Sequence, residues 1–133
     1  MIVLDASAVV ELVLNTEGGR RVAKRIAPPH ETLHAPHLLT VEVAQVLRRY
    51  SMAGELDART AAAAFGDLDD LTIERYDHEV LLSRVWSLRH NLTAYDAAYI
   101  ALAEALDAPL LTADRRLAGA PAHLARVEVV ETG

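Results

Sequence analysis

Short apolar runs alternate with segments of helical apolar spacing along this chain, and no feature restricts its fold more. Strands are predicted at residues 1–4, 33–35, 71–76, 109–112 and 127–130. Helices are predicted to begin directly after the first strand and to span 20–27, 38–52, 57–71, 77–90, 94–106 and 114–118. Such alternation favours a mostly parallel sheet with helices on both faces. We therefore expect a three-layer α/β/α sandwich.

Some helix ends and apolar faces follow from particular residues. Gly18 and Gly19 are expected to interrupt the chain before the helix at 20–27. Asp77 is the predicted N-cap of the helix at 77–90. That helix is expected to place Val80, Leu81, Val85 and Leu88 on one face.

The length and composition indicate one soluble domain over residues 1–133, because the chain is 52% hydrophobic and 24% charged. Asp5 and Glu11 break the apolar N-terminal run, so neither a signal nor a membrane segment is expected, and the predicted location is the cytoplasm. The absence of Cys excludes a disulfide scaffold and a thiolate zinc site. The net charge of -6 requires any nucleic acid to be held locally.

Four carboxylates fall where helices follow strands. Asp5 ends the first strand, Asp114 follows the fourth, and Glu42 and Asp96 lie in the opening turns of their helices. Ligands of open α/β sheets bind beyond the carboxyl ends of the strands, so we expect all four to face one crevice. Their mutual repulsion calls for a divalent cation, and oxygen ligands suit Mg²⁺ or Mn²⁺. The chemistry that follows is phosphodiester hydrolysis.

A purely structural role is open to three of the four. Asp5 and Asp114 have the positions of N-caps, and Asp96 completes a Thr-x-x-Asp capping pattern with Thr93. Glu42 interrupts an apolar run, which favours a functional role.

Other polar and aromatic residues near these positions have weaker signals. The aromatic residues Tyr95, Tyr99 and Trp86 have helical spacing and are expected to pack in the core. The three histidines His30, His34 and His37 are expected in an exposed loop rather than in a zinc site. Candidates for contacts with an RNA backbone are Arg48, Arg49, Arg115 and Arg116.

Three stretches carry a resemblance to a known family. They are VLDASAVVELVL at 3–14, TVEVAQVLRR at 40–49 and LTAYDAAYIALAEALDAPLLTADRRL at 92–117. In this order they resemble the PIN-domain family, in particular the VapC-type toxins of prokaryotic toxin–antitoxin pairs. The resemblance covers nearly the whole chain, without a departure at the four acidic positions.

The resemblance implies a Mg²⁺- or Mn²⁺-dependent endoribonuclease that forms a homodimer and is inhibited by a cognate antitoxin inserted into the active-site groove. By analogy, Asp5 and Asp96 are the principal metal ligands, and Glu42 and Asp114 complete the shell, orient waters or hold a second ion. Ser7 and Thr112 are the implied polar supports.

Two other functions remain open from the sequence. A phosphoacceptor receiver domain is also a small α/β fold with acidic strand ends, but Lys24 is the only lysine and cannot occupy a late strand end. A non-catalytic, partner-binding module that keeps the acidic cluster is the second alternative.

Overall fold

A five-stranded parallel sheet forms the middle of the molecule in the structure, a computed structural model that describes residues 1–132. The strand order is β3-β2-β1-β4-β5. The strands are β1 (Ile2–Leu4), β2 (Leu33–Pro36), β3 (Ile73–Tyr76), β4 (Leu110–Thr112) and β5 (Val127–Val129). The predicted α/β sandwich with a parallel sheet is confirmed.

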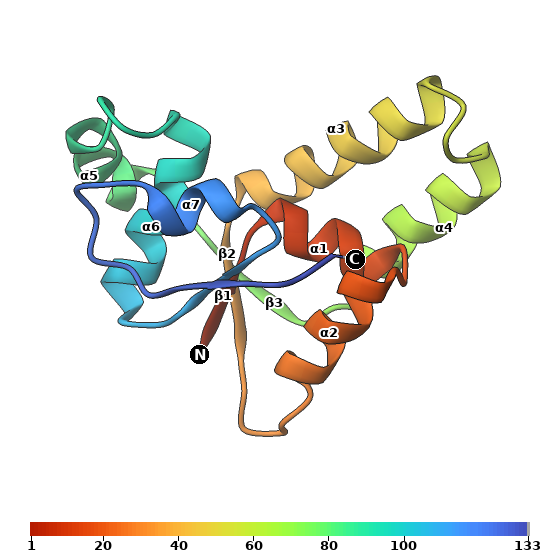
Figure 1. The fold of residues 1–133 in the computed structure, drawn as a ribbon, viewed down its shortest axis with the longest axis horizontal. Coiled ribbons are helices and arrows are strands. Elements are labelled where there is room, and N and C mark those ends of the chain that lie inside the picture. The colour runs from red at the N-terminus through yellow and green to blue at the C-terminus, as the bar shows by residue number, and fades with distance from the viewer. Residues whose placement is uncertain (133) are drawn as a thin grey trace.

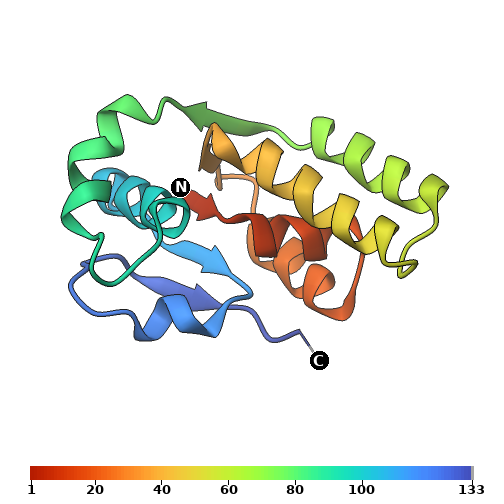
Figure 2. The same ribbon diagram turned by 90° about the horizontal axis from the view of Figure 1, so that it is seen from above.

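Helices cover both faces of this sheet. In Figure 1 the sheet separates α1 to α4 on the right from α5 and α6 on the left, and Figure 2 shows the same division from above. Helices α3 and α4 form a hairpin that extends away from the sheet. The helices are α1 (Ala6–Val13), α2 (Glu17–Ile26), α3 (Leu38–Met52), α4 (Ala58–Asp69), the 3-10 turn η1 (Glu79–Leu81), α5 (Leu82–Ser87), α6 (Ala94–Leu106) and α7 (Arg115–Gly119).

The core lies where the central strands meet the helices on either side. All residues of β1 and β4 are buried, as is the run 97–103 of α6. Strands covered on both faces are expected to be continuously apolar rather than alternating, and this explains the short apolar runs of the sequence. Among the described residues, no helix is both long and apolar enough to cross a membrane.

The sheet order places a topological switch point beside β1. The chain passes from β1 outward to β2 and β3, then returns to the other side of β1 to form β4 and β5. Leu4 and Leu111 are paired in the register of β1 and β4, so the ends of these two strands lie together. This is the place where open α/β sheets bind ligands.

The predicted interruption at Gly18 and Gly19 is wrong, because both glycines lie inside α2. The Thr16 hydroxyl caps this helix by accepting a hydrogen bond from the backbone N–H of Gly19 at 2.9 Å. A Cβ atom on Gly19 would lie 1.9 Å from the carbonyl oxygen of Glu11. The glycine is therefore explained by the close approach of α1 and α2.

The single helix predicted at 77–90 is also wrong. Asp77 does accept a hydrogen bond from the N–H of Glu79. The segment that follows forms the turn η1 and the short helix α5, which ends at Ser87. Val80 is 78% exposed, whereas Leu81 and Leu88 are buried. Val85 is partly buried and packs against the core, so three of the four predicted residues turn inward although the segment is not one continuous helix.

Two of the three aromatic residues assigned to the core lie on the surface. Trp86 is 69% exposed and Tyr95 is 64% exposed, whereas Tyr99 is buried as predicted. The Trp86 ring stacks under the guanidinium of Arg89, which lies 4.7 Å from its centroid.

His34 was predicted in an exposed loop, and it is instead 2% exposed within β2. Its Nε2 lies 2.7 Å from the Thr32 hydroxyl, and its Nδ1 lies 2.7 Å from the Tyr76 hydroxyl. Because both ring nitrogens have partners, this histidine is accommodated in the sheet. His30 and His37 are exposed, as expected.

Candidate active site

Asp5 is held at the end of β1 by three hydrogen bonds. Its Oδ1 accepts from the Ser7 hydroxyl at 2.7 Å and from the N–H of Ala8 at 3.1 Å, which caps α1. Its Oδ2 accepts from the Thr112 hydroxyl at 2.5 Å. The carboxylate is buried. Because it follows β1 and is bonded to Thr112 of β4, both strands fix its position.

Ser7 and Thr112 extend this network across the switch point. The Ser7 hydroxyl oxygen accepts from the N–H of Ala113 at 2.9 Å and lies 3.1 Å from the Thr112 hydroxyl. The Thr112 oxygen also accepts from the N–H of Asp114 at 3.0 Å. Both residues therefore support Asp5 and shape the turn that carries Asp114.

Glu42 lies in the second turn of α3 and is partly buried. Its Oε1 accepts a hydrogen bond from the Tyr99 hydroxyl of α6 at 2.6 Å. Tyr99 was predicted only as a core residue, and its apolar helical spacing carries no signal for this polar contact.

Asp96 lies in the first turn of α6, where Thr93 is the N-cap and accepts from the N–H of Asp96 at 3.1 Å. The cap of this helix is therefore Thr93, and the Asp96 carboxylate is not needed for it. Asp96 lines a cavity of about 290 Å³ together with Arg116 and Thr93.

Three of the carboxylates share one electrostatic environment. Burial is the main cause that raises the pKa of Asp5, Glu42 and Asp96. Repulsion adds to it, since the charge of Asp96 raises the pKa of Asp5 and of Glu42, and Asp5 acts on Glu42 as well. The hydrogen bonds from Thr112, Ser7 and Tyr99 oppose these increases. This cluster of Asp5, Glu42 and Asp96 is thus a site where a cation would relieve repulsion.

Asp114 differs from the other three. It caps α7 through the N–H of Arg116 at 3.0 Å, and it forms a bidentate pair with the Arg116 guanidinium at 3.0 and 2.7 Å. These hydrogen bonds lower the pKa of Asp114, while its charge raises the pKa of Asp96. Asp114 is therefore a neighbour of the cluster that is already paired.

The donor set fits a hard divalent cation. All four candidates are carboxylates, and no histidine or cysteine lies among them. In the part of the chain that the structure describes, no three acidic or histidine side chains are placed as direct ligands of one metal ion. Mg²⁺ needs one or two direct carboxylates and keeps several waters, so the separated carboxylates fit as direct ligands and as holders of those waters.

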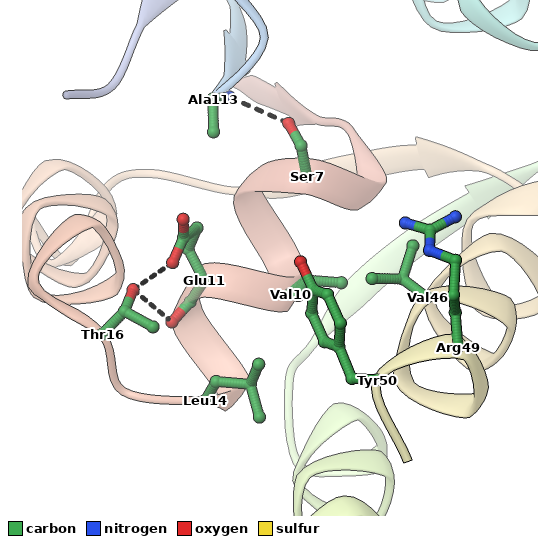
Figure 3. A pocket seen from close by; sticks show the side chains of 9 residues that line it. All are labelled: Ser7, Val10, Glu11, Leu14, Thr16, Val46, Arg49, Tyr50 and Ala113. Atoms are coloured by element: carbon green, nitrogen blue, oxygen red, sulfur yellow. Dashed lines mark hydrogen bonds between the residues drawn. The ribbon is translucent and has the colours of Figure 1, made fainter. Parts of the chain in front are cut away.

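A groove of about 410 Å³ adjoins the acidic cluster at Ser7 (Figure 3). It runs between α1 and α3, with Val10 and Leu14 facing Val46 and Tyr50. Polar lining residues are Ser7, Glu11, Thr16 and Arg49. The groove therefore combines an apolar floor with charged groups at the edge of the site.

The four candidate arginines lie in different surroundings. Arg49 lines this groove, and Arg48 lines a separate hollow between α3 and α4. Arg115 pairs with Glu131, and Arg116 pairs with Asp114. Only Arg49 and Arg116 thus line cavities that also contain residues of the site.

Comparison with known proteins identifies relatives over nearly the whole chain. The model of the PIN domain matches residues 2–122. Ribonuclease VapC1 of Mycobacterium tuberculosis (strain ATCC 25618 / H37Rv) is 43% identical over 129 residues, covering 96% of each chain. Ribonuclease VapC12 of the same strain is 39% identical over 130 residues, covering 98% of this chain and 99% of that protein.

Solved structures show the same fold at lower identity. PAE2754 from Pyrobaculum aerophilum is 22% identical with a TM-score of 0.68, over 96% of this chain and 83% of that chain. VapBC2 from Rickettsia felis, bound to a DNA fragment from their promoter, contains a chain that is 13% identical with a TM-score of 0.66, over 98% of this chain and 100% of that chain.

Proposed function

Because the chain belongs to the PIN-domain family, among the VapC-type ribonucleases, we propose that it is a metal-dependent endoribonuclease and the toxin of a toxin–antitoxin pair. The observation that carries the proposal is the cluster of Asp5, Glu42 and Asp96 beside the switch point of the sheet, where hydrogen bonds fix Asp5 and Glu42 and the charge of Asp96 acts on both. The names of its close relatives as ribonucleases support the reaction.

Asp5 and Asp96 are the proposed principal metal ligands, with Glu42 and Asp114 holding waters or a second ion. Mg²⁺ or Mn²⁺ held there would lower the pKa of a bound water and would stabilise the oxygen that leaves the phosphorus atom. Ser7 and Thr112 fix the Asp5 carboxylate by donating to its two oxygens. Asp114 keeps Arg116 beside the cavity of Asp96, where a guanidinium suits an RNA phosphate.

The proposed substrate is single-stranded or looped RNA, held locally because the chain has a net charge of -6. Arg49 and Arg116 are the arginines best placed for its backbone. Arg48 lines a separate hollow and Arg115 pairs with Glu131, so both are secondary candidates. The proposed location is the cytoplasm, which fits a chain without Cys.

The proposed protein partner is a cognate antitoxin. The groove between α1 and α3 supports this role, because its apolar floor meets the acidic cluster at Ser7. An inserted segment there would block the approach of RNA. We also propose that residues 1–133 form a single domain and that the protein is a homodimer.

The two alternatives are weighed by specific residues. A receiver domain requires a lysine at a strand end, and Lys24 lies exposed on α2. A non-catalytic module could keep the same carboxylates, so measured activity separates it from an enzyme.

Cleavage of a labelled single-stranded RNA by the purified protein tests the proposal. We expect cleavage with Mg²⁺ or Mn²⁺, none after chelation, and a loss on the order of 100-fold or more in Asp5→Asn. Asp107→Asn is the matched control, since this exposed aspartate pairs with Arg126 away from the cluster and asparagine tolerates its left-handed backbone. Cleavage that persists in chelator, or in Asp5→Asn, would contradict the proposed site.

The toxin role has a separate test. Expression of the chain should arrest growth, and co-expression of a neighbouring reading frame that encodes an antitoxin should restore it. Normal growth together with the absence of such a reading frame would count against this role while leaving the ribonuclease activity intact.

A further inference from the structure

Tyr99 combines a buried ring with a hydroxyl that meets the acidic cluster. The side chain is 2% exposed, and its hydroxyl donates to Glu42 Oε1 at 2.6 Å. Within residues 1–132 it makes the one side-chain hydrogen bond that joins α3 to α6. The position of Glu42 relative to α6 therefore depends on a single polar contact.

The same helix carries Asp96. Tyr99 follows Asp96 by nearly one helical turn, so both side chains lie on the same side of α6. Because α6 presents Asp96 and also holds Glu42, it sets the distance between two carboxylates that belong to different helices.

The hydrogen bond also distinguishes the two oxygens of Glu42. Oε1 accepts from Tyr99, whereas Oε2 accepts no hydrogen bond from the residues that the structure describes. Fixing one carboxylate oxygen orients the other, which is how residues behind a metal ligand set its direction.

We propose that Tyr99 is a positioning residue that holds Glu42 toward Asp96, so that the Oε2 atom of Glu42 faces the divalent cation. This inference rests on the proposed function, because it assigns a role within the same metal site. Tyr99 touches neither metal nor RNA, and it acts only through Glu42.

Mn²⁺ binding to the RNA-free protein, followed by electron paramagnetic resonance, tests the inference with Tyr99→Phe. The phenylalanine keeps the buried ring and removes the hydroxyl. We expect the Mn²⁺ dissociation constant to rise on the order of 10-fold, as is typical when a supporting hydrogen bond to a ligand is lost.

Tyr76→Phe is the matched control. It removes another tyrosine hydroxyl that bonds a buried side chain, that of His34, away from the cluster. Its Mn²⁺ affinity should equal that of the unaltered protein, even if its melting temperature falls as much as that of Tyr99→Phe. An equal loss of Mn²⁺ affinity in both variants would mean that general loosening is responsible and would overturn the inference.

A double-mutant cycle with Glu42→Gln separates positioning from structure. If Tyr99 acts through Glu42, Tyr99→Phe should change Mn²⁺ affinity little once Glu42 is replaced. The same loss in both backgrounds would overturn the inference. So would an unchanged Mn²⁺ affinity of Tyr99→Phe in a protein that still binds Mn²⁺ and cleaves RNA, a result that leaves the proposed function standing. Failure of the unaltered protein to bind Mn²⁺ would overturn the inference, whereas the proposed function is overturned only if RNA is not cleaved with either Mg²⁺ or Mn²⁺.

Discussion

Asp5 illustrates how one residue serves the fold and the proposed chemistry together. As the N-cap of α1 its charged form gains about 0.3 to 1 kcal/mol from the helix terminus. Burial of a carboxylate costs several kcal/mol, so burial prevails and the pKa of Asp5 is raised despite its hydrogen bonds. The helix cap therefore explains its place in the fold but does not relieve its charge, which leaves a role for a cation.

His34 yields a prediction about stability and pH. Burial lowers the pKa of His34 in the folded protein, whereas in the unfolded chain it is about 6.5. Below about pH 6.5 the unfolded chain therefore binds the proton first, and the free energy of unfolding falls as the pH falls. Denaturant unfolding at several pH values should show that His34→Gln loses less stability than the unaltered protein between pH 7 and pH 5.5.

In the metal-free protein the acidic cluster changes the free energy of unfolding with pH in the opposite direction to His34. The raised pKa values of Asp5, Glu42 and Asp96 make the folded protein take up protons more readily, so acidification relieves their repulsion. The acidic cluster is the same in His34→Gln and in the unaltered protein, so its contribution to the pH dependence of stability cancels when the two are compared. His90→Gln, at an exposed position, is the control, and a pH response of His34→Gln equal to that of the unaltered protein would refute the assignment.

At the scale of elements, the contact between α1 and α2 depends on one glycine. Gly19→Ala would place its Cβ 1.9 Å from the carbonyl oxygen of Glu11, a backbone atom that cannot move away cheaply. We expect a loss of about 1 to 3 kcal/mol in the free energy of unfolding, which thermal and denaturant melts would measure.

Gly66→Ala is the matched substitution. Gly66 lies inside α4, and nothing lies within 4 Å of an added Cβ there. Alanine is the better helix former, so this change should stabilise the protein by about 0.5 to 1 kcal/mol. Opposite signs for the two glycines are expected, and a stabilising Gly19→Ala would show that α2 packs differently.

A helix or strand was predicted correctly where the local sequence pattern alone decides its structure. Helix α3 has apolar periodicity and helix α6 is apolar over most of its length, and the bounds of both are as predicted. The pattern failed at Gly18 and Gly19, where a contact with another helix decides, and at 77–90, where Leu81 and Leu88 each turn inward from irregular backbone. The prediction for His34 was wrong because its buried ring has partners in Thr32 and in Tyr76, and Tyr76 lies on another strand, β3.

The site was predictable to a similar degree. The rule that ligands bind beyond the carboxyl ends of parallel strands indicated all four carboxylates as neighbours. The charges of Asp5 and Asp96 act on Glu42, and that of Asp114 acts on Asp96. The pairing of Asp114 with Arg116 and the hydroxyl of Tyr99 on Glu42 were not predicted. Both depend on side-chain directions, which spacing along a chain does not encode.

For the molecule as a whole, an exposed apolar patch supports the proposed homodimer. Leu82 and Tyr95 are exposed and line one hollow, and Val80 and Trp86 are exposed on the same segment, η1 and α5. Apolar patches on a soluble protein commonly mark association surfaces. Trp86→Glu should convert a dimer to a monomer in size-exclusion chromatography with light scattering.

Met52→Glu is the control for this substitution. Met52 is also an exposed apolar residue, and it lies at the end of α3 rather than in the patch. Its variant should keep the mass of the unaltered protein. A monomeric unaltered protein, or a dimer that survives Trp86→Glu, would refute the patch as the interface.

The order of the strands has a consequence for synthesis. Domains are made from the N-terminus, and β1 acquires its neighbour β4 only after residue 110 has been added. While the chain is still growing, the part that already contains Asp5 and Glu42 lacks the Thr112 hydroxyl that fixes Asp5 and the turn that carries Asp114. The proposed active centre can therefore assemble only after β4 and the turn that follows it have been added to the chain.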